Sequence, residues 1–107
     1  MKEKRKTSRA PLDIYLNKYV SGVPYMARTS DISSEGVSLA QLIEPQHQGS
    51  KVGLQFQLPG SVELIYAEGE VVREWAGSKA AGSGVRFTLL SARHRRMIDA
   101  FVEQHGN

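Results

Sequence analysis

The sequence has no cysteine among its 107 residues. This absence excludes disulfide bonds, zinc–thiolate sites and thiol catalysis. No apolar run approaches the roughly 20 residues that a membrane span needs. No apolar stretch follows the charged amino terminus as it would in a signal peptide. We therefore expect one cytoplasmic domain with no membrane insertion.

Recognisable catalytic and metal-binding patterns are also missing. The three histidines, His47, His94 and His105, do not have the spacing of metal ligands. The sequence contains no GxSxG, no P-loop and no GxGxxG after a strand. Asp99 and Glu103 are one helical turn apart, but we expect both to face solvent. These observations predict a protein that is not an enzyme and that uses no metal or cofactor.

Positive charge is concentrated at the amino terminus. Five of the 14 basic residues but only one of the 11 acidic residues lie in residues 1–9, so this segment carries +4 and the remainder −1. A basic tail on a neutral body favours an anionic partner, and a solubilising terminus is the alternative. Residues 1–10 offer little to a core, so we expect a flexible basic segment there and a folded domain over residues 11–107.

Alternation of apolar and polar residues predicts six β-strands after Pro11. Clusters of turn-forming residues separate the strands, among them residues 31–36 and the Gly-, Ala- and Ser-rich loop expected over 77–84. Gly69 is a candidate β-bulge within the longest strand. The expected strands lie near residues 12–16, 25–30, 37–39, 51–58, 62–74 and 85–89.

The last segment changes to a helical period. Ser91 is a suitable N-cap for a helix over residues 92–104. An apolar stripe along this segment predicts packing against a sheet; it consists of Met97, Ile98, Phe101 and Val102. Six short strands followed by one amphipathic helix predict a mainly β fold: a six-stranded antiparallel β-barrel with a C-terminal α-helix.

Two short motifs stand at the start of this pattern. Residues 5–9 read RxxxR, and residues 31–36 read DxSxxG. Each alone has a structural explanation: RxxxR arises readily in a basic tail, and DxSxxG is typical of a tight turn whose glycine takes a positive φ.

Together and in this order, the motifs resemble the PilZ domain, the bacterial receptor domain for cyclic di-GMP. Gly84-Val85-Arg86-Phe87 resembles the last barrel strand of that family, and a terminal helix follows as it does there. The resemblance covers essentially the whole chain. It implies a six-stranded antiparallel barrel with a terminal helix, in a stand-alone member of the family.

The resemblance implies that Arg5 and Arg9 bind cyclic di-GMP through the arginine motif, and Asp31, Ser33 and Gly36 through the second motif. The chemistry of these side chains suits the ligand. A guanidinium can donate two bonds to guanine O6 and N7, or to phosphate oxygens. A carboxylate can accept from the guanine N1–H and amine, a hydroxyl can bond a base or phosphate, and a glycine lets backbone approach the ligand.

Four further residues are weaker candidates for the same site. Lys4 and Lys6 add charge next to the arginines, although Lys4 occupies a position where the family often has a third arginine, and a lysine lacks the fork. Arg73 is a candidate phosphate contact. Trp75 is either a core or rim aromatic or an apolar wall against a guanine or ribose.

Four basic residues, Arg93 to Arg96, occupy the start of the expected helix, where the helix dipole disfavours cations. They are either solvated or part of a docking surface for an acidic partner.

The sequence therefore predicts a receptor whose basic segment closes over cyclic di-GMP and presents a new surface to a downstream protein, with motility or biofilm regulation as the output that the resemblance implies. A nucleotide-independent adaptor of the same fold is the alternative. Binding of DNA or RNA is not expected, because the body is neutral and only 7% of residues are aromatic.

Overall fold

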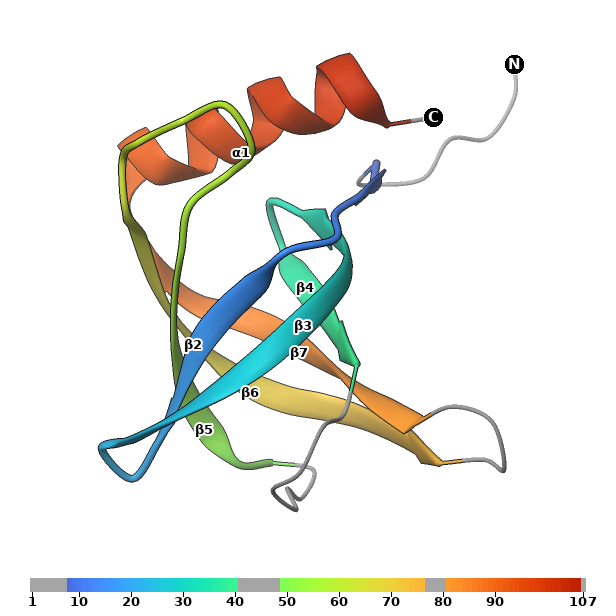
Figure 1. Ribbon diagram of the computed structural model, residues 1–107, viewed down its shortest axis with the longest axis vertical. Helices are drawn as coiled ribbons and strands as arrows, with labels where there is room; N and C mark the ends of the chain where they lie inside the picture. The colour runs from blue at the N-terminus through green and yellow to red at the C-terminus, as the bar shows by residue number, and fades with distance from the viewer. Residues whose placement is uncertain (1–7, 41–48, 77–80, 107) are drawn as a thin grey trace.

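The computed structural model describes residues 8–40, 49–76 and 81–106, with backbone alone for residues 75, 76 and 81. Within these ranges the chain forms seven strands and one helix (Figure 1). The elements are β1 (Ala10–Pro11), β2 (Tyr15–Val20), β3 (Val23–Ser33), β4 (Gly36–Ala40), β5 (Lys51–Phe56), β6 (Ile65–Ala76), β7 (Ala81–Leu90) and α1 (Ala92–His105).

The six longer strands form a closed antiparallel barrel. Neighbouring strands follow the order β3-β2-β5-β6-β7-β4, and a pairing between β3 and β4 closes the circle. The two-residue strand β1 adds to β3, where Ala10 pairs with Ile32 and Pro11 with Asp31. This architecture confirms the predicted six-stranded barrel, and closure removes the exposed sheet edges that promote aggregation.

Apolar side chains on alternate strand positions fill the barrel. Ile32, Leu39, Leu54, Ile65 and Val71 have at most 1% of their surface exposed, and they come from four different strands. Strands with one face toward a core and one toward water produce this period of two.

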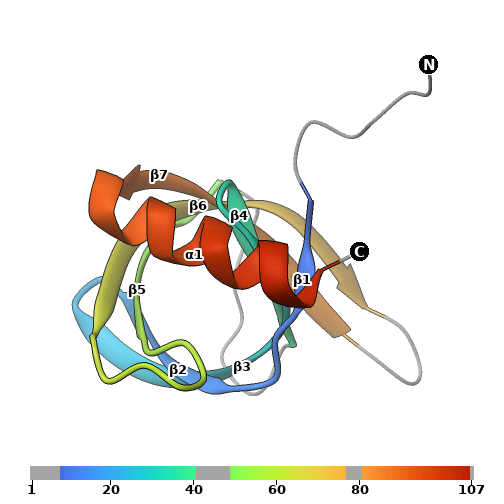
Figure 2. The same cartoon turned by 90° about the horizontal axis from the view of Figure 1, so that it is seen from above.

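Helix α1 lies across one end of the barrel (Figure 2). The hydroxyl of Ser91 accepts a hydrogen bond from the backbone N–H of His94, as expected of an N-cap. Ile98 and Val102 are buried against the core, and Met97 and Phe101 pack beside them. The predicted helix and its apolar stripe are thus confirmed. This 14-residue element, the one helix in the described ranges, is too short and too polar to cross a membrane.

The strand expected over residues 12–16 is interrupted in the structure. β1 and β2 flank β3 on the same side, but residues 12–14 between them are outside any strand. Here the hydroxyl of Thr29 donates to the carbonyl of Leu12 and accepts from the N–H of Ile14. The Thr29 side chain therefore replaces some of the backbone hydrogen bonds between the two strands. The alternation of apolar residues does not reveal this replacement.

Two other segments predicted as irregular are strands. β3 continues through Asp31 to Ser33, so the turn expected over residues 31–36 is confined to Ser34 and Glu35. Residues 81–84 of the expected loop belong to β7, while 77–80 lie outside the described residues. Gly82 and Ser83 are buried between β4 and β6. The composition that suggested a loop thus reflects close strand packing.

A β-bulge does lie opposite Gly69, but its extra residue belongs to the partner strand β7 and not, as predicted, to the longest strand β6. Glu68 pairs with Leu89 while Gly69 pairs with Phe87, so β7 carries an extra residue, Thr88, at this point. The extra residue reverses the alternation, so Leu89, which would face inward if the pattern of Val85 and Phe87 continued, is 54% exposed.

Candidate functional site

Three of the predicted site residues, Arg9, Asp31 and Ser33, meet directly in the structure. The guanidinium of Arg9 donates from Nε to Asp31 Oδ1 at 2.9 Å and from Nη2 to the same oxygen at 2.6 Å. Its Nη1 donates to the hydroxyl of Ser33 at 3.3 Å. The two charged side chains are each 39% exposed. The pair therefore lies at the surface of the barrel, where solvent screens its attraction.

The backbone explains why Arg9 reaches this position. The residue that follows it, Ala10, is fully buried in β1 and pairs with Ile32 of β3. This pairing places Arg9 beside the end of β3 that carries Asp31 and Ser33. Arg9 belongs to the segment that we expected to be flexible, whereas in the structure its side chain is held by Asp31 and Ser33 of the second motif.

Ser33 is completely buried and serves the local structure as well as Arg9. Its hydroxyl accepts a hydrogen bond from the backbone N–H of Glu35 at 3.1 Å, which closes the turn between β3 and β4. A serine at this position thus both shapes the turn and presents an oxygen to Arg9.

Gly36 is required by strand packing. It begins β4 between Ser33 of β3 and Arg86 of β7. A Cβ at this position would overlap the carbonyl oxygen of Val85. Gly36 is not among the residues with positive φ, so the left-handed turn conformation that DxSxxG suggests is not its reason for being glycine.

A groove of about 580 Å³ opens beside these residues, over β4, β6 and β7. Four of the predicted site residues line it: Arg9, Asp31, Gly36 and the weaker candidate Arg73. A Cβ at Gly84 would lie 3.8 Å from Cβ and Nε of Arg73, which is ordinary van der Waals contact, so the Arg73 side chain lies against this part of β7. The other lining residues are Glu35, Val37, Ser38, Val72, Gly84, Val85 and Arg86.

Arg86 and Glu70 were not among the predicted site residues. The Arg86 guanidinium donates to Glu70 Oε1 at 2.9 Å, across the neighbouring strands β6 and β7. Because Arg86 alternates with the buried residues Val85 and Phe87, it lies on the outer face of the strand. The sequence pattern could therefore have identified Arg86 as an exposed arginine. The groove is therefore lined by three arginines, with carboxylates beside them.

The other predicted site residues are not placed in this groove. Arg5, Lys4 and Lys6 lie outside the described residues. Trp75 pairs through its backbone with Gly82 in the β6–β7 ladder. Its side chain lies outside the described part of the structure.

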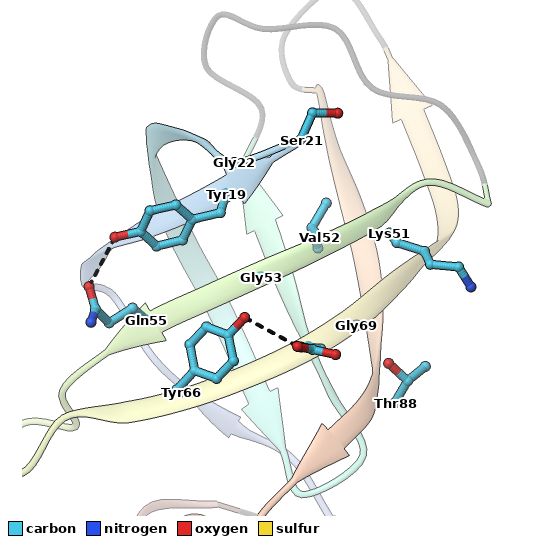
Figure 3. A pocket seen from close by; sticks show the side chains of 11 residues that line it. Tyr19, Ser21, Gly22, Lys51, Val52, Gly53, Gln55, Tyr66, Gly69 and Thr88 are labelled. Atoms are coloured by element: carbon cyan, nitrogen blue, oxygen red, sulfur yellow. Dashed lines mark hydrogen bonds between the residues drawn. The ribbon is translucent and has the colours of Figure 1, made fainter.

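A second groove, of about 560 Å³, lies over β2, β5 and β6 (Figure 3). Tyr19 and Tyr66 stand on either side of Gly53, where a Cβ would come within 3.0 Å of the Tyr66 hydroxyl oxygen. None of the predicted site residues lines this groove. The two motifs therefore point to the arginine-lined groove, although both hollows have similar volumes.

The basic start of α1 has specific partners. Arg93 donates two hydrogen bonds to Glu63, at 2.8 and 2.7 Å, and His94 contacts the same carboxylate at 3.1 Å. Chiefly through the Arg93 hydrogen bonds, this arrangement lowers the pKa of Glu63 to about 2. Arg95 donates to the carbonyl of Ser34 at 2.8 Å. Of these basic residues, Arg96 alone makes no polar contact with the described part of the chain.

The fold and the groove together define a class: a small antiparallel β-barrel domain, covered at one end by a helix, with an arginine- and carboxylate-lined groove over its outer strands. Within that class, the chain belongs to the PilZ domain family, whose model matches residues 3–104.

Solved structures share this fold. The inhibitor of motility MotI (DgrA) from Bacillus subtilis superimposes with a TM-score of 0.85 at 14% identity, over 96% of this chain and 51% of that chain. The PilZ domain of YcgR from Escherichia coli, solved with c-di-GMP, gives 0.69 at 12% identity, over 96% and 92%. The MrkH–c-di-GMP complex from K. pneumonia gives 0.74 at 15% identity, over 97% and 53%.

The chain therefore spans about half the length of the MotI and MrkH chains. Identities this low show the fold alone. No curated protein matches the chain.

Proposed function

We propose that this chain is a receptor for cyclic di-GMP and not an enzyme, and that it binds the dinucleotide in the groove beside Arg9 and Asp31. One observation carries the proposal: Arg9 and Asp31, 22 residues apart in the sequence, meet at the rim of a groove that two further arginines line. Membership of the PilZ family and the c-di-GMP in the YcgR and MrkH structures support the same ligand.

The paired side chains have the chemistry to recognise guanine. The Arg9 fork can donate to O6 and N7 of one guanine edge. The Asp31 carboxylate can accept from the N1–H and the exocyclic amine on another edge. In the structure Nε and Nη2 of Arg9 both donate hydrogen bonds to Oδ1 of Asp31. Binding therefore replaces the hydrogen bonds between Arg9 and Asp31 with hydrogen bonds to the ligand. The pairing also preorganises both side chains close to the positions that they take in the complex.

The remaining charges of the groove suit the two phosphates of the ligand. Arg73 and Arg86 line the groove on the side of β6 and β7. A volume of about 580 Å³ lies within the range of ordinary small-molecule sites, roughly 300–1,000 Å³. Arg5, with Lys4 and Lys6 beside it, completes the arginine motif from the segment that precedes Arg9, and Trp75 supplies an apolar wall.

Signal output follows from closure of the basic segment. When Arg5 contacts the ligand, the part of the basic segment that precedes Arg9 closes over the groove and creates a new surface. A downstream protein reads this surface. The second messenger is an intracellular bacterial molecule, so we place this signalling in the cytoplasm, with motility or biofilm formation as the regulated process.

The test is titration calorimetry of the full chain with cyclic di-GMP, with Asp31→Ala and Asp13→Ala as a matched pair of variants. Asp13 also forms a forked pair with an arginine, Arg28, at 2.7 and 2.9 Å, but away from the groove. We expect wild type and Asp13→Ala to bind equally and Asp31→Ala to bind far more weakly. Absence of binding by the wild type overturns the proposal and leaves the nucleotide-independent adaptor as the alternative.

A further inference from the structure

Helix α1 holds the turn that carries the second motif. Arg95, in the second turn of the helix, donates from Nη1 to the carbonyl oxygen of Ser34 at 2.8 Å. Ser34 follows Ser33 directly and is the first residue of the two-residue turn between β3 and β4. The contact joins residues 61 positions apart, so it depends on how the helix docks on the barrel.

This turn is fixed by three polar contacts from three different parts of the chain. The Ser33 hydroxyl accepts from the N–H of Glu35 at 3.1 Å. The carbonyl of Glu35 accepts from the N–H of Phe87 in β7 at 2.8 Å. Arg95 supplies the third, and it is the only one of the three that comes from the helix. The conformation of this turn determines the position of the Ser33 hydroxyl oxygen, which accepts from Arg9.

The opposite end of α1 touches the other half of the site. A Cβ at Gly106, the residue that ends the helix, would lie 2.6 Å from the carbonyl oxygen of Val102 and 2.7 Å from that of Arg9. The backbone of Arg9 therefore runs directly against the end of the helix. Since α1 also packs on β1 and β3, this one helix contacts the chain beside both motifs.

We propose that Arg95 is a positioning residue for the cyclic di-GMP site, so that docking of α1 and ligand binding favour each other. The inference rests on the proposed function and adds the element that regulates it. Arg95 does not line the groove and acts through the Ser34 carbonyl. Because coupling between two equilibria is reciprocal, a ligand that requires the motif turn in this geometry also stabilises the docked helix.

The chain offers a matched control for the charge of Arg95. Arg96, the next residue, has the same charge but makes no polar contact with the described residues. Long-range attraction for a dianionic ligand is nearly the same from both positions, whereas the hydrogen bond to Ser34 belongs to Arg95 alone. The pair Arg95→Met and Arg96→Met therefore separates positioning from charge.

The experiment measures cyclic di-GMP affinity by calorimetry for wild type, Arg95→Met, Arg95→Lys and Arg96→Met, all in the full chain. Arg95→Met retains the apolar stem without the donor, and Arg95→Lys retains one donor for the one acceptor. We expect Arg95→Met to bind about threefold to tenfold more weakly. We expect Arg95→Lys and Arg96→Met to stay within about twofold of wild type, because surface charge is screened by salt.

Hydrogen exchange of the α1 amides supplies a readout that a merely structural role leaves unchanged. In the wild type, saturating cyclic di-GMP should slow exchange in α1, and in Arg95→Met this protection should shrink. Equal affinity of wild type and Arg95→Met, or equal losses in Arg95→Met and Arg96→Met, overturns the positioning role while the proposed receptor function stands. Failure of the wild type to bind overturns both.

Discussion

Replacement of Arg9 by alanine should weaken ligand binding much more than it weakens the fold. In the free protein Arg9 makes three side-chain hydrogen bonds, two to Asp31 and one to Ser33. In the proposed complex the same guanidinium contacts the ligand in a forked geometry. The variant therefore removes a solvent-screened pair from the free state and a ligand contact from the bound state.

The two losses differ in size. The Arg9 and Asp31 side chains are each 39% exposed, so their pair resembles surface ion pairs, which contribute about 0.2–1 kcal/mol. For a domain of this size that is a fall of roughly 5 °C or less in melting temperature. Loss of a forked, charge-assisted ligand contact costs about 2–5 kcal/mol, which is ~30-fold to several-thousand-fold in affinity.

Calorimetry with cyclic di-GMP and thermal unfolding of the same samples separate these effects. Arg28→Ala is the control, because Arg28 forms a similar pair with Asp13 away from the groove. It should leave affinity unchanged. Arg9→Lys keeps the charge but loses the fork, so its affinity should fall between wild type and Arg9→Ala. An affinity of Arg9→Ala within about twofold of wild type would refute the assignment of Arg9 to the site.

Three further outcomes are expected. Cyclic di-AMP should bind at least about a hundredfold more weakly than cyclic di-GMP in a competition assay, because adenine lacks the paired donors that Asp31 accepts; comparable affinities exclude that role. Saturating cyclic di-GMP should slow trypsin cleavage after Arg5 and Lys6, and equal rates with and without ligand contradict closure of the basic segment. Arg93 lowers the pKa of Glu63 from 4.5 to about 2, so ionised Glu63 stabilises the fold above pH 4.5 and this contribution is lost as pH falls from 4.5 toward 2. Denaturant unfolding from pH 7 to 2 should show this loss in wild type and not in Glu63→Gln, and identical pH profiles would contradict it.

Local sequence patterns predicted some features of the site correctly and others wrongly. RxxxR and DxSxxG identified Arg9 and Asp31 as members of one constellation, and the structure pairs them. The same motif suggested a turn at Asp31 and a left-handed glycine at Gly36. In the structure Asp31 lies in β3, and Gly36 is needed because β7 passes so close that a side chain would meet the Val85 carbonyl. That approach depends on strands distant in sequence, which no local pattern encodes.

The sequence alone predicted the barrel and its helix. The alternation of apolar residues with a period of two and the stripe that contains Ile98 and Val102 are local patterns, which a short segment already contains. Only the tertiary structure decided what those elements bring together. Strand order and register place Arg73 and Arg86 along one groove. The docking of α1 brings Arg95 to the motif turn. These contacts join residues far apart in the chain, so their geometry exists only once the barrel has closed.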